Sequence, residues 1–184
     1  MGDLNRYAAL LRGIAPSGKN MTNDKLRRVF EGLGFEGVSS VLSSGNIVFH
    51  SAATDVAALE NRVEAALTSE LGLSSRTIIR GHPDLRALVD SDPFPGLTHG
   101  RGTYLTATFL KDVAPRTTTV PGESDRLAHS VRYDPGARVV LAVIDTSDPG
   151  RASGFMASLE KAYGREITTR SWLTVQRIVR KLES

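Results

Sequence analysis

The chain of 184 residues is 40% hydrophobic and 23% charged, a composition typical of one large or two small globular domains. The absence of cysteine excludes disulfides, thiol nucleophiles and thiolate-held metal sites, and it favours a reducing cytoplasm as the location. The net charge of +3 is only mildly basic, and the N-terminal apolar run is too short for a signal peptide or a membrane span. We therefore expect a soluble, cytoplasmic protein with no membrane partner.

The first eighty residues carry the pattern of a β-α-β-β-α-β unit. Helices are indicated by apolar residues at i, i+3, i+4 and i+7 spacing, and strands by short β-compatible runs beside turn residues. Thr22 is a candidate N-cap, and Gly34 and Gly72 are candidate helix stops. In chain order the predicted elements are a strand at 7–12, a helix between Thr22 and Gly34, a hairpin of strands 38–42 and 46–50, a helix at 56–71 and a strand at 77–80.

A turn-rich segment separates these elements from the rest of the chain. After a short helix around residues 85–89, residues 90–102 contain two prolines and three glycines, a composition typical of a linker. We therefore predict an N-terminal subdomain at 1–80, a helix and linker at 81–102, and a C-terminal subdomain at 103–184.

The C-terminal subdomain resembles the first in element order, although no residue-level repeat is visible in the sequence. Its predicted elements are a strand at 104–110, a polar irregular loop at 117–122, a hairpin of strands 131–133 and 138–144, a helix closed by Gly164, an edge strand at 167–169 and a final helix from Ser171. The fold predicted is α+β, with two tandem ferredoxin-like (split βαβ) subdomains, antiparallel sheets and a C-terminal helix.

The stretch GIAPSGKN, between the first strand and the first helix, has the spacing of a nucleotide-binding P-loop. Asn20 stands where that motif needs a hydroxyl for Mg²⁺. Glycines at a strand-to-helix junction still favour an anion, and Lys19 would add positive charge beside Arg12. The plainer alternative is that Gly13 and Gly18 only allow the chain to turn, while Lys19 is solvated.

The predicted fold argues against nucleotide hydrolysis at this loop. P-loop domains alternate strands and helices around a parallel sheet, whereas a tight hairpin makes neighbouring strands antiparallel. The run 138–145 resembles the metal-binding strand of such enzymes, but it follows a hairpin turn, so we interpret Asp145 as a turn or cap residue. We expect no cofactor and no metal.

An RNA-recognition module shares this element order and stacks bases on sheet aromatics. Tyr7 and Phe49 occupy the corresponding strands, but the module's basic and aromatic signature is missing, and Phe49 is more typical of a core. An open sheet face with Tyr7, Arg12, His50 and Arg80 near it remains a reasonable platform for a single strand.

The single tryptophan, Trp172, follows Arg170 at the start of the final helix. One interpretation is structural, with Ser171 as the N-cap and Trp172 packed over the preceding strand. The other is a ligand or partner surface, because tryptophan and arginine are favoured interface anchors.

No catalytic constellation stands out among the remaining residues. The four histidines lack metal-binding spacings, and the serine-rich segments lack a nucleophile elbow. We therefore assign no catalytic residue and leave open whether the protein is an enzyme, with binding favoured.

Five sequence blocks occur in the order found in a known family. They are ALLRGI with GKN at 9–20, LR and LGF at 26–35, SGN with VF at 44–49, LRALV and DPFP at 85–95, and TTRSW with TV at 168–175. In these blocks the chain resembles the uncharacterised bacterial family known as domain of unknown function 1697. The resemblance implies two ferredoxin-like halves and brings no established activity. The chain departs from the family pattern at Ala15, Pro16, Ser17, Ser43, Ser171 and Leu173.

The sequence thus favours a non-hydrolytic binding protein for a phosphate-bearing small molecule or nucleic acid. An enzyme acting on a phosphorylated substrate, with Lys19 and Arg12 stabilising charge, and a protein-interaction module are the alternatives. The oligomeric state is left open. The candidate ligand-binding residues are Arg12, Gly13, Gly18, Lys19, Asn20, Ser44, Gly45, Asn46, Arg170 and Trp172.

Overall fold

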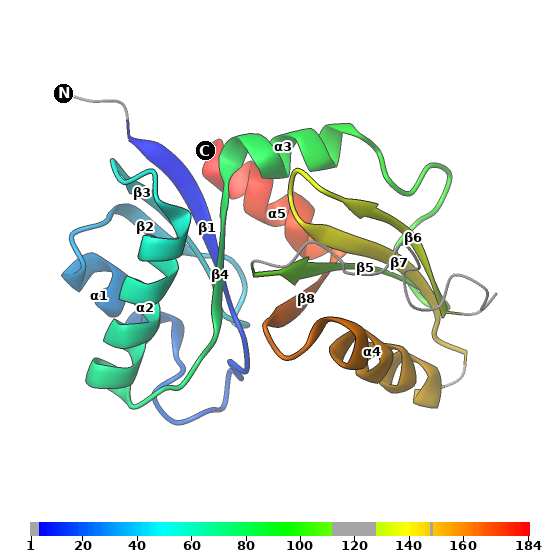
Figure 1. Cartoon of the computed structure of the whole chain (residues 1–184), viewed down its shortest axis with the longest axis horizontal. Helices are drawn as coiled ribbons and strands as arrows, with labels where there is room; N and C mark the ends of the chain where they lie inside the picture. The colour runs from blue at the N-terminus through cyan, green and yellow to red at the C-terminus, as the bar shows by residue number, and fades with distance from the viewer. Residues whose placement is uncertain (1–3, 112–127, 148) are drawn as a thin grey trace. The chain divides into compact units, whose positions relative to one another are not determined.

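A computed structural model describes residues 4–111, 128–147 and 149–184 of the chain (Figure 1). The polar loop expected at 117–122 therefore lies outside the described residues. The chain divides into two compact units, the first comprising Met1–Arg86 and Arg177–Ser184 and the second Ala87–Gln176. Each unit holds a four-stranded antiparallel sheet, which confirms the α+β class and the tandem arrangement.

The first unit has the predicted β-α-β-β-α-β order. Its strands lie in the order β2-β3-β1-β4, and all three neighbouring pairs are antiparallel, as in the ferredoxin-like fold. The elements are β1 (Asn5–Leu11), α1 (Asn23–Gly32), β2 (Glu36–Ser40), β3 (Asn46–Ser51), α2 (Val56–Leu71) and β4 (Thr77–Gly81).

Both helices of this unit end as the sequence predicts. Thr22 is the N-cap position of α1, and Gly34 follows its end with a φ of +79°. The carboxylate of Asp55 accepts the Ala58 N–H at the start of α2, and Gly72 closes that helix at a φ of +67°. Such left-handed positions are easily adopted by glycine, so these two glycines fix where each helix stops.

The strand β2 differs from the predicted 38–42, beginning and ending two residues earlier. Leu42 adopts a φ of +60°, which takes it out of the extended conformation. The Val41 carbonyl accepts a hydrogen bond from the side chain of Asn46, the first residue of β3, so Val41 already belongs to the turn between β2 and β3. The prediction included Val41 and Leu42 because both are apolar. In the structure the turn begins at Val41, so the strand ends at Ser40.

The core of the first unit is aromatic and lies between its sheet and its helices. Tyr7 pairs with Phe49 across β1 and β3, and their ring centroids are 5.6 Å apart. Phe35 stacks on Phe49 at 4.5 Å, and Phe30 of α1 meets Phe49 edge-on at 5.5 Å. These rings belong to one buried cluster with apolar residues of α2 such as Val63. Burial raises the pKa of the Tyr7 hydroxyl, which donates to the Ala53 carbonyl at 2.7 Å.

This core corrects the open-platform interpretation of the first sheet. Tyr7 is 5% exposed and Phe49 is fully buried, so neither ring is available to stack on a base. The side chains of these two residues point to the helix-covered face, opposite to the one an RNA-recognition module would use.

Two carboxylates on α2 hold the outer edge of β4, a feature that the sequence did not reveal. Glu60 accepts the Ile79 N–H and Glu64 accepts the Thr77 N–H, both at 2.8 Å. Glu60 is buried with Arg80, whose guanidinium lies 3.8 Å from the carboxylate. An edge strand presents unpaired N–H groups, and here two side chains one helical turn apart on α2 supply their acceptors.

The second unit repeats the strand order of the first, as β6-β7-β5-β8. Phe155 and Leu159 of its helix pack against Val140 and Ala142 of its sheet. The divisions between the two units fall inside two helices. The part of α3 up to Arg86 and the part of α5 from Arg177 belong to the first unit. The elements are α3 (His82–Asp90), β5 (Thr103–Leu110), β6 (Ala128–Asp134), β7 (Val139–Asp145), α4 (Pro149–Tyr163), β8 (Ile167–Ser171) and α5 (Trp172–Leu182).

The two sheets share one cross-strand pair, in which an arginine of an edge strand lies opposite an alanine of the neighbouring strand. Arg80 of β4 lies opposite Ala8 of β1, and Arg170 of β8 lies opposite Ala107 of β5. Each arginine donates to the carbonyl of the residue before it, at 2.7 Å and 3.0 Å respectively. The duplication that was visible only in element order thus extends to this position.

We predict that removing the Glu60 carboxylate destabilises the chain strongly. Glu60→Ala leaves a buried N–H without its acceptor and a buried guanidinium without its counter-charge, a loss of about 3–5 kcal/mol. Glu60→Gln, which retains an acceptor, should cost less. Urea denaturation measures both, with Glu70→Ala on the exposed face of α2 as the control. Equal midpoints for Glu60→Ala and Glu70→Ala would refute this role.

Candidate functional site

The two glycine motifs of the first unit meet at the end of β1. The Leu11 N–H donates to the Gly45 carbonyl at 2.8 Å. A Cβ added to Gly45 would lie 2.8 Å from Cγ1 of Ile14, and its φ is +75°. Glycine is therefore required at the hairpin turn, because the loop after β1 packs directly against it. We call residues 12–20 the glycine loop.

The glycine loop folds on itself before the helix begins. Gly18 donates its N–H to the Ala15 carbonyl at 2.9 Å, and Met21 donates to the Gly18 carbonyl at 3.1 Å. The helix α1 starts only at Asn23, so Lys19 lies in a turn ahead of it. Lys19 is thus not at the helix start, where the sequence suggested it, but four residues before the first residue of α1.

Asn20 connects the glycine loop to both helices. Its Nδ2 donates to the Leu71 carbonyl at the end of α2, at 3.1 Å, and its Oδ1 accepts from Lys25 Nζ at 2.7 Å. Asn20 has a φ of +63°, which asparagine tolerates better than most residues. The side chain therefore has a structural role, and it draws the Lys25 ammonium toward the loop. No sequence pattern indicated Lys25 as part of this site.

Asn46 is fully buried and holds the β2–β3 turn. Its Nδ2 donates to the Val41 carbonyl at 3.0 Å and to Ser44 Oγ at 3.1 Å. The Ser44-Gly45-Asn46 turn is thus a support on which the glycine loop rests, and its polar side chains bond to one another.

Other groups of the glycine loop face outward. Lys19 is exposed, whereas Arg12 is half-buried and its main chain is bonded to Arg76 and Ser75. Within the described residues, the backbone N–H has no hydrogen-bond acceptor at five loop positions: Gly13, Ile14, Ser17, Lys19 and Asn20. These donors, with the Lys19 ammonium, form the part of the loop that is open to a ligand.

Positive charge is concentrated around this loop. Residues 12–28 contain five basic residues and one acidic residue, a net charge of +4, while the whole chain carries only +3. The one acid, Asp24, pairs with Arg27. The other basic residues of this segment are Arg12, Lys19, Lys25 and Arg28, so its positive charge is not cancelled by acidic residues within it.

Arg170 lies in the second unit, where it is bonded to its own strand. It donates to Thr168 Oγ1 at 2.8 Å as well as to the Thr169 carbonyl. Burial lowers the pKa of the Arg170 guanidinium to about 10. These contacts describe an arginine that stabilises an edge strand.

Trp172 is a packing residue of the second unit. It is 6% exposed and meets Phe94, from the DPFP segment, edge-on with ring centroids 5.4 Å apart. Ser171 Oγ accepts the Thr174 N–H at 3.3 Å, as an N-cap should. The structural interpretation of this motif therefore accounts for Trp172.

The comparisons with known proteins identify a family. The model of a family described as "Protein of unknown function (DUF1697)" matches residues 4–133. The chain belongs to this family. A solved structure, conserved bacterial protein SP0830 from Streptococcus pneumoniae, is similar over 99% of this chain and 100% of its own, with a TM-score of 0.73 and 19% identity. That similarity shows the fold alone. No curated protein matches the chain significantly.

The described residues also bear on metal binding and on membrane insertion. In the described part of the chain, no group of three or more His, Cys, Asp or Glu residues could hold a metal ion. None of the described helices is long and apolar enough to cross a membrane.

We predict that Trp172→Ala unfolds the chain more readily, because it leaves a cavity beside Phe94. The expected loss is about 3–5 kcal/mol in a denaturant titration. Leu173→Ala is the matched control, since Leu173 is the next residue, is 39% exposed, and should change stability by less than about 0.5 kcal/mol. A stably folded Trp172→Ala protein would instead assign the tryptophan to a binding surface.

Proposed function

We propose that this protein is a cytoplasmic binder of a phosphate-bearing small molecule, and that the glycine loop holds the phosphate. The observation that carries the proposal is the net charge of +4 on residues 12–28, which exceeds that of the whole chain. The rest of the chain has a net charge of −1, so an anion is attracted to this segment in preference to other surfaces.

The geometry of the loop supports this choice. A phosphate accepts several hydrogen bonds, and the N–H groups of Gly13, Ile14 and Ser17, which have no acceptor among the described residues, are suitable donors. The Lys19 ammonium supplies a full positive charge within the same turn. Because the contact between Gly45 and Ile14 and the bonds of Asn20 already fix the loop, little conformational entropy would be lost on binding.

The buried aromatics favour a small ligand over a nucleic acid. Binding of single strands relies on aromatic side chains that stack with bases. In the first unit the rings of Tyr7, Phe30, Phe35 and Phe49 all lie in the core. A phosphate site without a stacking surface fits a phosphorylated metabolite.

The proposal predicts that Lys19→Ala weakens phosphate-ligand binding. We expect pyrophosphate or ATP to raise the melting temperature of the wild type, because a ligand of the folded state stabilises it. Lys19→Ala should reduce the affinity about tenfold, equivalent to about 1.4 kcal/mol. The exposed Lys161 of α4 provides the control, since Lys161→Ala should not change binding.

Two results would contradict this function. One is that neither pyrophosphate nor ATP shifts the wild type, and the other is that Lys19→Ala responds like Lys161→Ala. Titration with a short oligothymidine at several salt concentrations tests the nucleic-acid alternative, because a polyphosphate strand shows a steep dependence of affinity on salt. If the oligonucleotide binds more tightly than ATP, with a steep dependence on salt, the ligand is a nucleic acid and not a metabolite.

A further inference from the structure

A cavity of about 400 Å³ lies in the first unit at the start of β1, the end of the strand opposite to the glycine loop. Its volume falls in the range of about 300–1,000 Å³ that is usual for small-molecule sites. The wall combines apolar side chains with charged ones from β1 and the first turn of α3. The residues that matter for its chemistry are Leu4, Arg6, Val56, His82, Pro83 and Asp84.

Arg6 supplies the positive charge of the cavity. Its Nη1 donates to the Leu182 carbonyl at 2.9 Å, which fixes the direction of the guanidinium. That carbonyl is uncharged, and a guanidinium has five N–H donors, so the charge and most of the donors are left for another acceptor. Arg6 is itself exposed.

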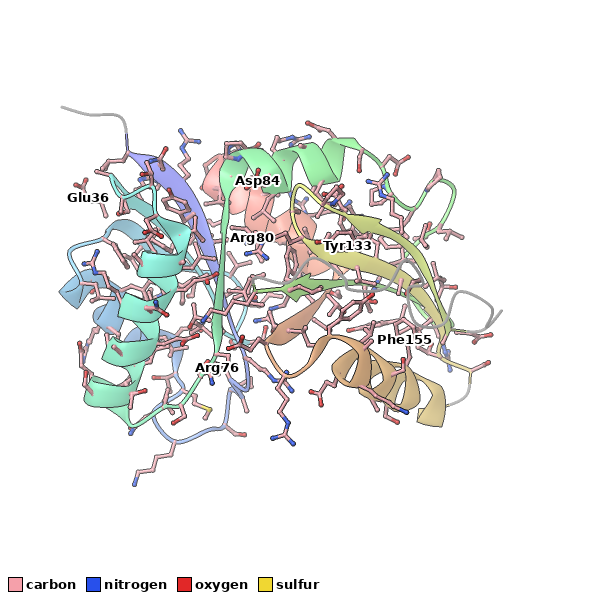
Figure 2. The ribbon with its side chains drawn as sticks, viewed as in Figure 1. Glu36, Arg76, Arg80, Asp84, Tyr133 and Phe155 are labelled. Carbon is pink, nitrogen blue, oxygen red and sulfur yellow. The ribbon has the colours of Figure 1, made fainter. Side chains whose placement is uncertain are left out.

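Asp84 supplies the negative charge. It lies in the first turn of α3, where a carboxylate interacts favourably with the helix dipole (Figure 2). Among the described residues, Asp84 has no hydrogen bond or ion pair. Its position in the helix accounts for some stability, but it leaves the carboxylate oxygens without a cation.

The other charges near the cavity are already paired. His82 Nε2 lies 3.0 Å from Glu183 Oε1, and Arg86 Nη1 lies 3.5 Å from the same oxygen. The hydrogen bond from His82, with Arg86 nearby, lowers the pKa of the Glu183 carboxyl. Glu183 is therefore occupied by these two partners, and no ion pair joins it to Arg6 in the described structure.

We propose that this cavity binds a small zwitterion, a free amino acid or short peptide with apolar side chains. Arg6 holds the carboxylate and Asp84 holds the ammonium. The apolar wall formed by Leu4, Val56 and Pro83 receives the side chains. A simple anion would be repelled by Asp84 and a simple cation by Arg6, whereas a zwitterion complements both.

The proposal is tested by calorimetric titration of the full chain with L-leucine and with leucyl-leucine. At least one should bind saturably to the wild type. Blocking the amine by acetylation, or the carboxylate by amidation, should each weaken that ligand at least tenfold. Arg6→Ala and Asp84→Asn should each have a similar effect. The exposed residues Lys161 of α4 and Glu31 of α1 serve as controls, so Lys161→Ala and Glu31→Gln should bind like the wild type.

The phosphate site does not enter this test, because Lys19→Ala should leave leucyl-leucine binding unchanged. NMR titration of the wild type gives a second measurement that needs no variant, with shifts expected at the start of β1 near Asn5 and at the junction of β4 and α3 near Gly81. The proposal is overturned if neither ligand binds, if the blocked ligands bind as well as the free one, or if the shifts lie elsewhere in the chain.

Discussion

The first unit depends on the pairing of β1 with strands on both of its edges. β1 is bonded to β3 on one side and to β4 on the other, so its backbone groups are satisfied and it can carry consecutive apolar residues. The same pairing fixes the two ends of the strand against their neighbours. At one end the Leu11 N–H is held by Gly45, which places the glycine loop on the hairpin turn. At the other end Tyr7 is paired with Gly81, which brings Arg6 to the first turn of α3.

The glycine loop shows how a familiar spacing can serve a different structure. Gly18 and Asn20 use their polar groups inside the protein, and Asn46 supports the adjoining turn. The loop also carries backbone N–H groups that have no acceptor among the described residues, the exposed Lys19 and a basic neighbourhood. This arrangement can attract a phosphate electrostatically without the helix start or the metal ligand of a nucleotide hydrolase. The internal bonds hold the loop in place, so the outward groups are organised before any ligand arrives.

Comparison of the two sheets explains why Arg170 and Trp172 belong with the architecture. Arg80 and Arg170 occupy equivalent positions on edge strands and bond to equivalent carbonyls. Their neighbours differ, since Arg80 faces the buried Glu60 whereas Arg170 bonds to Thr168. Each unit thus keeps a strand-edge arginine and satisfies it in its own way. In the second unit Arg170 bonds within its own strand and Trp172 is buried against Phe94, and a ligand role for the pair stays a prediction.

The sequence by itself determined the element order, the helix ends and the antiparallel class, because helix spacing, Gly34 and Gly72 act over a few residues. The sequence also indicated that the glycine loop and the hairpin turn are both candidate binding segments. It did not indicate that the two segments touch. Only the tertiary structure decided which face of the sheet buries Tyr7, that Glu60 receives an edge-strand N–H, and that Asn20 caps α2. It alone brought Arg6 and Asp84 to one cavity. These features join residues that lie far apart along the chain, and their partners are set by strand register and helix packing, which no local pattern records.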